Sequence, residues 1–474
     1  MQQTAQMNFA GIDILIIVGY FAALMVAGFA WIRRGKTSED YFLAGRTLTL
    51  PAFVATLVAT WYGGILGVGE FAHQNGLSAW FVFGVPYYVF AAIFALVLAP
   101  RIRQSTLYTI PDKIDEAYGK TAAVIAAGFV YCLTTPAPYV LMLGVLLQLI
   151  FGWPLIPALL VGTVLSSVYV YFGGFRSDVR VNIVQFVLMF VGFAVILPYC
   201  YWSIGGLTHL KAALPATHLT WNGGNSPGYV IAWFFIALWT LVDPGFHQRC
   251  YAAKDAKTAQ RGVLISILFW IVFDFMTCTA GLYARAALPD IEPVMAYPLL
   301  AEKLLPAGVK GLFYVAMLAT VMSTLVSYLF LAGVTFTRDF VWRLEGGDPD
   351  ERLNLRTFLG LTLTIVIALV LAILVPSVVK LWYAVGTTFI PGLLLPLLSA
   401  YWPRLRVRRK AAGVLMILAS LTSLLWLIWG QTHLVDGWAK YPLGLEPMYP
   451  GLIVSLVGFS IARIPKENAS VSAG

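Results

Sequence analysis

Charge is scarce in this sequence. Asp, Glu, Lys and Arg make up 11% of the 474 residues, whereas 60% of the residues are hydrophobic. A soluble protein of this length does not need so apolar a composition. The scarcity of charge therefore excludes a soluble globular protein and indicates a polytopic membrane protein.

The residue types that enzymes and metal sites use are also few. The chain has four cysteines and five histidines. The cysteines, at positions 132, 200, 250 and 278, have neither metal-ligand spacing nor a disulfide pattern. No zinc-protease, nucleophile-elbow or phosphate-loop motif occurs, and no loop is long enough to form a nucleotide-binding domain. These absences argue against an enzyme and exclude an ATP-driven pump within this chain.

Long apolar runs are what the sequence has in abundance. Hydropathy predicts thirteen spans, at approximately 9–32, 50–72, 78–100, 121–150, 154–173, 180–203, 228–247, 261–285, 309–337, 356–376, 380–401, 411–430 and 447–463. The first span lacks a small-residue cleavage signature and carries Asp13 near its start. We therefore expect it to be a retained helix rather than a signal peptide.

The basic residues cluster in alternate loops. The clusters are Arg33, Arg34, Lys36 and Arg46, then Arg101, Arg103, Lys113 and Lys120, then Arg249, Lys254, Lys257 and Arg261, then Arg404, Arg406, Arg408, Arg409 and Lys410. The positive-inside rule then predicts an external N-terminus and a cytoplasmic C-terminus in a plasma membrane, with an odd number of spans. The net charge of +9 thus reflects basic residues in the loops on one side of the membrane, and a nucleic-acid partner is not expected.

Two spans contain helix-breaking residues. Gly63-Gly64 weakens the second span at its middle, and Asp243-Pro244-Gly245 interrupts the seventh. Breaks at corresponding positions of two halves point to a binding site near the middle of the membrane. Close packing by glycine, or a simple proline kink, is the alternative for either break alone.

Four hydroxyl side chains share one face of the ninth span. Thr320, Ser323, Thr324 and Ser327 have the spacing i, i+3, i+4 and i+7, which aligns them along a helix. Polar groups in lipid need a protein, water or ion partner. Hydroxyl oxygens suit a desolvated alkali cation, and helix–helix packing is the alternative.

Several stretches of the chain resemble the sodium:solute symporter family, which includes sodium-coupled sugar, proline, pantothenate and sialic acid transporters. These stretches are YFLAGRTL before the second span, GGFRSDVRVNIVQ at 173–185, QRCYAAKDAKTAQRG at 248–262 and LATVMSTLVSYLFLAGVTFTRD at 318–339. The resemblance implies an all-α, leucine-transporter-like inverted repeat of five plus five core helices. It also implies Na⁺-coupled import of a small polar organic solute by alternating access, with no enzymatic activity.

This resemblance also suggests how the chain is organised. We expect one transporter domain over residues 1–474, with an extra N-terminal helix at 9–32, repeats at 50–203 and 228–401, and two C-terminal helices at 411–463. The lipid bilayer and a small solute are the expected partners. Proton coupling through acids in or near the spans, such as Asp243, Asp274 or Glu70, is one alternative. A non-transporting solute sensor of the same fold is another.

The family's sodium site can be carried over to this chain residue by residue. The resemblance assigns the side chains of Ser323 and Thr324 and the backbone carbonyls of Ala59, Tyr62 and Thr320. Members with a second sodium site have a Thr-Asp pair where this chain has Val181-Asn182, so one Na⁺ per solute is expected. Asp178, one turn nearer the cytoplasm, is expected to pair with Arg176 or Arg180.

Candidate solute-binding residues surround the two breaks. They are Trp61, Gly63, Tyr87, Trp239, Asp243, Asp274 and Trp382. Aromatic residues at helix ends also form interface belts, which is the alternative for Tyr87 and Trp382. The set contains acids and no buried Lys or Arg, so it favours a polyol, amine or zwitterion over an organic anion.

Overall fold

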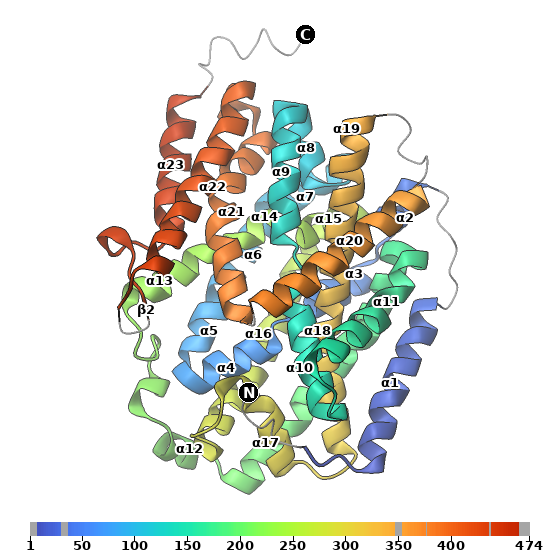
Figure 1. Ribbon diagram of the computed structural model, residues 1–474, viewed down its shortest axis with the longest axis vertical. Coiled ribbons are helices and arrows are strands. Elements are labelled where there is room, and N and C mark those ends of the chain that lie inside the picture. The colour runs from blue at the N-terminus through green and yellow to red at the C-terminus, as the bar shows by residue number, and fades with distance from the viewer. Residues whose placement is uncertain (1–6, 30–36, 347–352, 376, 436–437, 464–474) are drawn as a thin grey trace.

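The computed structural model describes residues 7–29, 37–346, 353–375, 377–435 and 438–463, and these are helical almost throughout (Figure 1). The first half contains α1 (Gly11–Phe29), α2 (Ser38–Leu43), η1 (Ala44–Arg46), α3 (Leu50–Trp61), α4 (Ile65–Asn75), α5 (Ser78–Phe83), α6 (Val85–Ile93), η2 (Phe94–Leu98), α7 (Ala99–Gln104), α8 (Ile110–Tyr118), α9 (Lys120–Leu133), α10 (Ala137–Phe151) and α11 (Leu155–Ile204).

The second half continues with α12 (Leu207–Ala213), η3 (Ala216–Leu219), α13 (Pro227–Ile236), α14 (Trp239–Val242), α15 (Pro244–Ala252), α16 (Ala256–Ala287), η4 (Pro293–Met295), α17 (Ala296–Leu304), α18 (Val309–Val334), η5 (Thr335–Trp342), α19 (Arg343–Glu345), α20 (Leu353–Leu374), α21 (Val378–Tyr401), η6 (Pro403–Leu405), α22 (Arg409–Thr432), η7 (Pro442–Gly444) and α23 (Met448–Ile461). Two short strands, β1 (Leu434–Val435) and β2 (Trp438–Ala439), pair antiparallel, with Leu434 opposite Ala439.

The predicted number of thirteen spans is not confirmed. In the described part of the chain, ten helices are long and apolar enough to cross a membrane, or eleven if the bent pair α3 and α4 counts as one. The spans predicted at 154–173 and 180–203 correspond to the two helical segments of α11, which meet at a kink at Gly174, where φ is 55° and ψ is −146°. The span predicted at 447–463 holds only the 14-residue α23.

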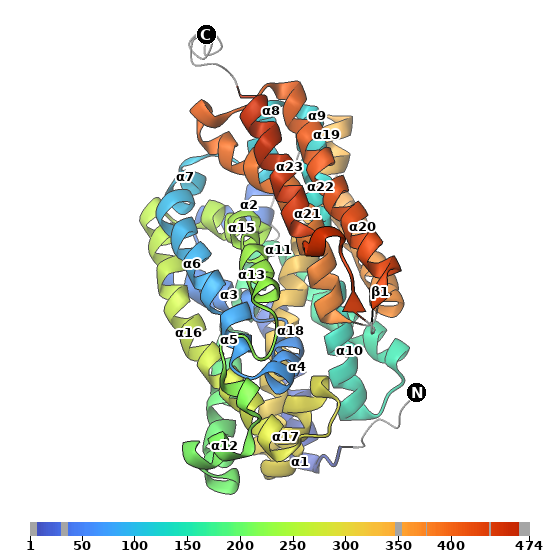
Figure 2. The same cartoon turned by 90° about the vertical axis from the view of Figure 1, so that its left-hand side faces the viewer.

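Helix α18 forms the centre of the molecule in both views (Figures 1 and 2). The apolar window within Val309–Glu345 is 100% buried, against 28% to 33% for α1, α11 and α20. The exposed side chains of these outer helices are large and apolar, such as Leu15, Val26 and Leu374. Helices α1, α11 and α20 therefore present a lipid-compatible surface, and α18 is enclosed by protein on all sides.

Both predicted helix breaks are present. Helix α3 ends at Trp61 and α4 begins at Ile65, with a bend of 57° between them. Helix α14 ends at Val242, Asp243 is extended (φ −67°, ψ 119°), and α15 begins at Pro244. A helix end leaves backbone carbonyls or N–H groups without intrahelical partners. The two breaks therefore supply free backbone groups inside the protein.

The segments that precede α3 and follow α15 are joined by backbone hydrogen bonds. The N–H of Leu48 donates to the Ala252 carbonyl at 3.0 Å, and the N–H of Lys254 donates to the Leu48 carbonyl at 2.9 Å. Arg103 adds a side-chain bond to the Lys254 carbonyl at 3.1 Å. We call this the basic end of the molecule, because Arg46, Arg101 and Arg103 lie there; Arg33, Arg34 and Lys36 lie outside the described residues.

Candidate sodium and solute sites

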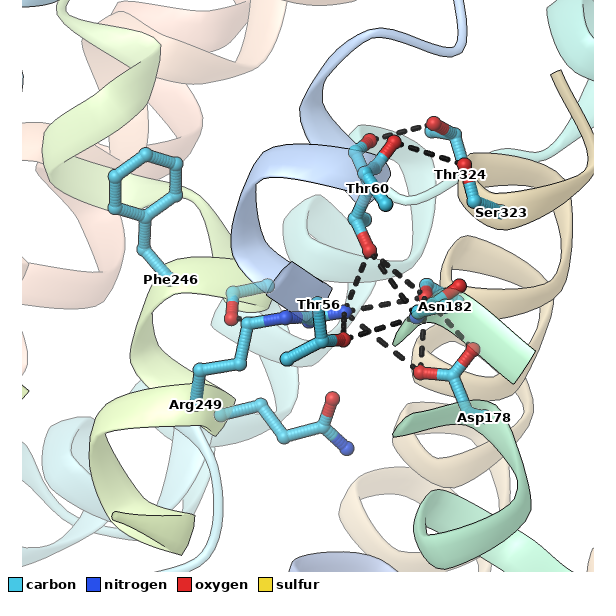
Figure 3. A network of polar contacts seen from close by, with 12 residues as sticks. Thr56, Thr60, Asp178, Asn182, Phe246, Arg249, Ser323 and Thr324 are labelled. Carbon is cyan, nitrogen blue, oxygen red and sulfur yellow. Dashed lines mark hydrogen bonds and ion pairs between the residues drawn. The ribbon is translucent and has the colours of Figure 1, made fainter. Parts of the chain in front are cut away.

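The hydroxyl face of α18 contacts the broken end of α3 (Figure 3). The Ser323 Oγ lies 2.8 Å from the Ala59 carbonyl oxygen and 2.9 Å from the Thr320 carbonyl oxygen. The Thr324 Oγ1 donates to the Thr60 carbonyl oxygen at 2.5 Å. All five residues are buried. The last turn of α3, freed of intrahelical partners by the break, thus faces two hydroxyls across a buried contact.

The structure brings together four of the five residues predicted for sodium. Ala59, Thr320, Ser323 and Thr324 share one hydrogen-bonded cluster. The Thr320 hydroxyl donates back to the Ala316 carbonyl at 2.6 Å, so only the Thr320 carbonyl belongs to the cluster. Tyr62 lies at the C-cap of α3.

Sequence reasoning missed Thr60, whose carbonyl accepts from Thr324. A backbone acceptor gives no side-chain signal in a sequence, and the carbonyl used depends on where the helix ends.

Gly63 allows this close approach of the two helices. A Cβ at position 63 would lie 2.2 Å from the Thr324 Cβ and 2.3 Å from its Oγ1. No real Cβ tolerates such a distance, and the neighbour is a branched side chain on the fully packed helix α18. Glycine at position 63 is therefore required by the contact between the α3–α4 break and Thr324, and not by backbone strain.

The donor set of this cluster fits a monovalent alkali cation. Its oxygens are carbonyls and hydroxyls, which are hard and uncharged and can replace part of the hydration shell of such an ion. Divalent metals are usually held by carboxylate, imidazole or thiolate groups. Among the described residues, no group of three or more His, Cys, Asp or Glu could hold a metal ion.

A cavity of about 100 Å³ lies beside the two breaks. It is lined by Trp61, Tyr62, Gly64, Val68, Phe83, Tyr87, Tyr139, Trp233, Ile236, Trp239, Asp274, Tyr328 and Trp382. A single buried water needs roughly 10–15 Å³ of such space, so the cavity has room for a small organic solute. Its walls are mainly aromatic, as is common for ligand sites.

Five of the seven residues predicted for the solute line this cavity. They are Trp61, Tyr87, Trp239, Asp274 and Trp382. Gly63 contacts Thr324 instead, and its neighbour Gly64 lines the cavity. The aromatic residues Tyr139, Trp233 and Tyr328 were not predicted, because they lie within apolar helices away from the two breaks, where aromatic side chains ordinarily pack in a core.

Asp243 lies outside the cavity lining and supports its wall. One carboxylate oxygen caps α15 by accepting from the Phe246 N–H at 2.9 Å. The other accepts from the Tyr328 hydroxyl at 2.8 Å. Asp243 therefore fixes the second helix break and orients a cavity-lining ring.

Asp274 is the charged residue of the cavity wall. Its carboxylate accepts a hydrogen bond from the Tyr88 hydroxyl, and no Lys, Arg or His is among the lining residues that the structure describes. Trp61 packs edge-to-face on Tyr87, with ring centroids 5.1 Å apart. The cavity thus combines one acidic group with electron-rich ring faces.

The predicted pairing of Asp178 with Arg176 or Arg180 is wrong. Asp178 pairs with Arg249, at 3.7 Å, and Arg176 pairs with Asp40 at 3.2 Å. Arg249, grouped above with the basic loops, is completely buried in α15. The error arose because α15 continues the broken seventh span into the protein, so the motif QRC is not in a loop.

Comparison with known proteins identifies one family and relatives that cover most of the chain. The family model described as "Sodium:solute symporter family" matches residues 41–417. The chain is 25% identical to the sodium/glucose cotransporter of Vibrio parahaemolyticus, over 77% of this chain and 75% of that protein. It is also 25% identical to the sodium/pantothenate symporter of Escherichia coli (strain K12), over 95% of this chain and 96% of that protein.

Solved structures share the fold. The substrate-bound, outward-open state of a Na⁺-coupled sialic acid symporter matches with a TM-score of 0.79 and 18% identity over 98% of both chains. Mhp1, a nucleobase-cation-symport-1 family transporter in a closed conformation, matches with a TM-score of 0.60 and 12% identity, over 90% of this chain and 95% of that chain. The expected leucine-transporter-like architecture is confirmed.

Proposed function

Since the chain belongs to the sodium:solute symporter family, we propose that its α3–α18 cluster binds the coupling Na⁺ and that the adjoining aromatic cavity binds the solute. The chain is a multi-pass secondary transporter that uses Na⁺ to move a small solute, and it is not an enzyme. The proposed sodium ligands are the Ala59, Tyr62 and Thr320 carbonyls and the Ser323 and Thr324 hydroxyls. The observation that carries this assignment is the 2.8 Å contact between Ser323 Oγ and the Ala59 carbonyl.

We call the cluster of Ala59, Thr320, Ser323 and Thr324 the sodium cluster. Its position explains how the ion would drive transport. An ion held between α3 and α18 stabilises every conformation in which these helices touch. Opening at the basic end requires α3 to leave α18, which separates Ala59 from Ser323 and releases the ion. Na⁺ and solute are coupled because both favour the same conformations.

The orientation in the membrane follows from the same proposal. The basic end faces the cytoplasm, as the positive-inside rule requires, and the N-terminus is external. Residues 50–203 and 228–401 form the two inverted repeats, and each begins with its broken helix. Residues 9–32 and 411–463 flank this core.

The solute is a small amine or zwitterion. A carboxylate among aromatic faces attracts a protonated nitrogen through charge pairing and cation–π contact. An organic anion would meet Asp274 without a compensating cationic side chain, since no described lining residue is basic. A polyol is the second candidate, because aromatic rings and hydroxyls also line the cavity.

Sodium dependence of uptake into proteoliposomes tests the ion site. We expect Ser323→Ala or Thr324→Ala to raise the Na⁺ concentration for half-maximal uptake about tenfold or more, since polar contacts to a charged group contribute about 1.5–3 kcal/mol. Thr320→Ala is the matched control, because the Thr320 hydroxyl bonds to Ala316 and its carbonyl is retained. Unchanged sodium dependence in both Ser323→Ala and Thr324→Ala would reject the site.

A thermal-shift screen of the purified protein with Na⁺ present tests the solute class. Amines, zwitterions, polyols and carboxylates are compared at equal concentration, and we expect amines or zwitterions to stabilise most. Asp274→Asn should abolish that stabilisation, whereas the exposed Asp290→Asn should not. Stabilisation by carboxylates alone would refute the assignment.

A further inference from the structure

A second set of polar side chains lies next to the sodium cluster, below it in Figure 3. We call this set, which is formed by Thr56, Thr60, Asp178 and Ser327 around Arg249, the cage. The guanidinium of Arg249 enters it from α15 and is completely buried. The Nη2 atom lies 2.7 Å from Thr60 Oγ1, 3.1 Å from Thr56 Oγ1, 3.1 Å from Ser327 Oγ and 3.7 Å from Asp178 Oδ2. The cage is therefore built by α3, α11 and α18 around one atom.

The geometry differs from that of an ordinary buried ion pair. A structural Arg–carboxylate pair is typically bidentate, with two short parallel hydrogen bonds. Here a single contact of 3.7 Å joins the two groups, and both Asp178 oxygens accept from the Ser327 hydroxyl at 2.9 Å instead. The nitrogen Nη2 has only two protons for four oxygen neighbours. It is placed as a coordinated cation would be, at the centre of an oxygen shell.

Asn182 lies behind this shell and contacts two of its hydroxyls. Its amide nitrogen lies 2.9 Å from Thr56 Oγ1 and 3.2 Å from Ser327 Oγ, and its amide oxygen has no hydrogen-bond partner among the described residues. The shell thus holds one full negative charge, on Asp178, and several neutral oxygens. Such a set is suited to one monovalent cation, and the guanidinium provides that charge.

The cage and the sodium cluster share one residue. The carbonyl of Thr60 accepts from Thr324, and the hydroxyl of Thr60 accepts from Arg249. A cation in the cage therefore stabilises the same turn of α3 whose carbonyls belong to the sodium cluster.

We propose that the Arg249 guanidinium fills a second cation site as a charge fixed to the chain, so that one mobile Na⁺ accompanies each solute. The proposal rests on the proposed sodium function of the Ser323 cluster. Removing the guanidinium would leave Asp178 buried without a counter-charge, which is strongly unfavourable. An external cation would then enter the vacated cage.

Counting ions tests this proposal. Reversal potentials of solute-driven current in proteoliposomes give the charge moved per solute, and binding of radioactive ²²Na⁺ to purified protein gives the number of sites. We expect one Na⁺ for the wild type and two for Arg249→Gln, with the Hill coefficient for Na⁺ rising from about one toward two. Arg249→Lys is the matched control that keeps the charge, and it should stay at one.

Further variants distinguish failure of the Arg249 proposal from failure of the proposed sodium cluster. The double variant Arg249→Gln/Asp178→Asn removes both charges and should return to one Na⁺. Two sodium ions in the wild type, or one in a folded Arg249→Gln, would overturn the proposal, and a wild-type count of two overturns it even if Arg249→Gln does not fold. Ser323→Ala with undiminished ²²Na⁺ binding would instead refute the sodium cluster itself.

Discussion

Two adjacent glycines have different roles at the first helix break. Gly63 faces the sodium cluster, where a Cβ would overlap Thr324, and Gly64 faces the solute cavity, where a Cβ would lie 1.7 Å from Cη2 of Trp382. Neither position has a positive φ among those recorded for the described residues. The two glycines are needed for space, and their side-by-side placement connects the proposed ion site to the proposed solute site through one turn of chain.

Substituting Gly64 should therefore weaken solute binding. Gly64→Ala pushes the Trp382 ring out of the cavity wall, and we expect the KM for the solute to rise about tenfold, equivalent to about 1.4 kcal/mol of lost binding. Gly67→Ala is the control, because its Cβ would lie 3.4 Å from the same ring, an ordinary contact. A KM that rises equally in both variants would contradict the role given to Gly64. Initial uptake rates over a range of solute concentrations measure it.

At this scale the sequence predicted side chains better than backbone. Hydroxyls, rings and acids are conspicuous in apolar helices, which makes Ser323, Thr324, Trp61 and Asp274 candidates, and the family resemblance assigns the first two to sodium; the roles of all four stay predictions. Thr60 was missed because it acts partly through a carbonyl, and Arg249 was misassigned because basic residues near a span end usually face water. Only the packing of α15 against α3 and α18 shows that this arginine is internal.

At the scale of elements, a group of ion pairs ties α8 to the end of α18 at the basic end. Asp112 accepts from Arg338 at 2.9 Å and from Arg343 at 2.6 Å. Burial opposes ionisation of Asp112, but the two arginines hold its pKa below the usual value. Thr109 caps α8 and also donates to Asp339 at 2.8 Å. These contacts fix α8 against the extension of α18 formed by η5 and α19.

Neutralising Asp112 should loosen this attachment. Asp112→Asn removes the carboxylate that pairs with Arg338, whereas Arg343 keeps Asp115 and Asp339, and losing one partner of a largely buried pair costs about 3–5 kcal/mol. The melting temperature of the detergent-purified protein should fall by several degrees. Glu116→Gln on the same helix is the control, since Glu116 is half exposed and surface pairs contribute about 0–1 kcal/mol. Equal melting temperatures for the two variants would be the contrary result.

The helix breaks and kinks show why the number of membrane spans is harder to predict from the sequence than their positions. The helix breaks at Gly63-Gly64 and Asp243-Pro244 follow from local chemistry, and the structure has both. At Gly174, the sequence predicts a connection between the spans 154–173 and 180–203, and the structure has two helical segments that meet there at a kink of one non-helical residue, without a longer loop. That glycine packs against Tyr41, whose carbonyl would lie 2.5 Å from a Cβ at position 174, and such long-range crowding has no sequence signal.

At the scale of the whole molecule, two histidines connect segments at the end opposite the basic end. His218 of η3 contacts the His73 carbonyl at 3.0 Å, and His73 contacts the Leu288 carbonyl at 2.9 Å. These bonds join three segments that are distant in sequence. Burial lowers the pKa of His218 below its ordinary value, although the bond to the His73 carbonyl partly opposes this shift.

Acid should therefore destabilise this end. A histidine whose pKa is lower in the folded than in the unfolded protein gives its full stabilisation above the unfolded pKa of about 6.5. As the pH falls below that value, the unfolded chain binds more protons and the stabilisation is lost. We expect the melting temperature to drop between pH 7.5 and 5.5, and to drop less in His218→Gln. The exposed His209→Gln should keep the wild-type slope, and a His218→Gln slope equal to it would argue against the mechanism.

The closed basic end gives a direct test of alternating access. Cys250 is completely buried in α15, between the α3 contact and the backbone bonds of Leu48 with Ala252 and Lys254. It becomes accessible only if this end opens. In a Cys132→Ala/Cys200→Ala/Cys278→Ala background, we expect N-ethylmaleimide to label Cys250 about tenfold more slowly in Na⁺ than in K⁺, because bound Na⁺ holds α3 on α18 and shifts the population toward the closed end. Adding Ser323→Ala should remove this protection without changing the rate in K⁺. If labelling proceeds equally fast in both salts, the ion does not hold the basic end shut, and coupling would have to act through the solute cavity alone.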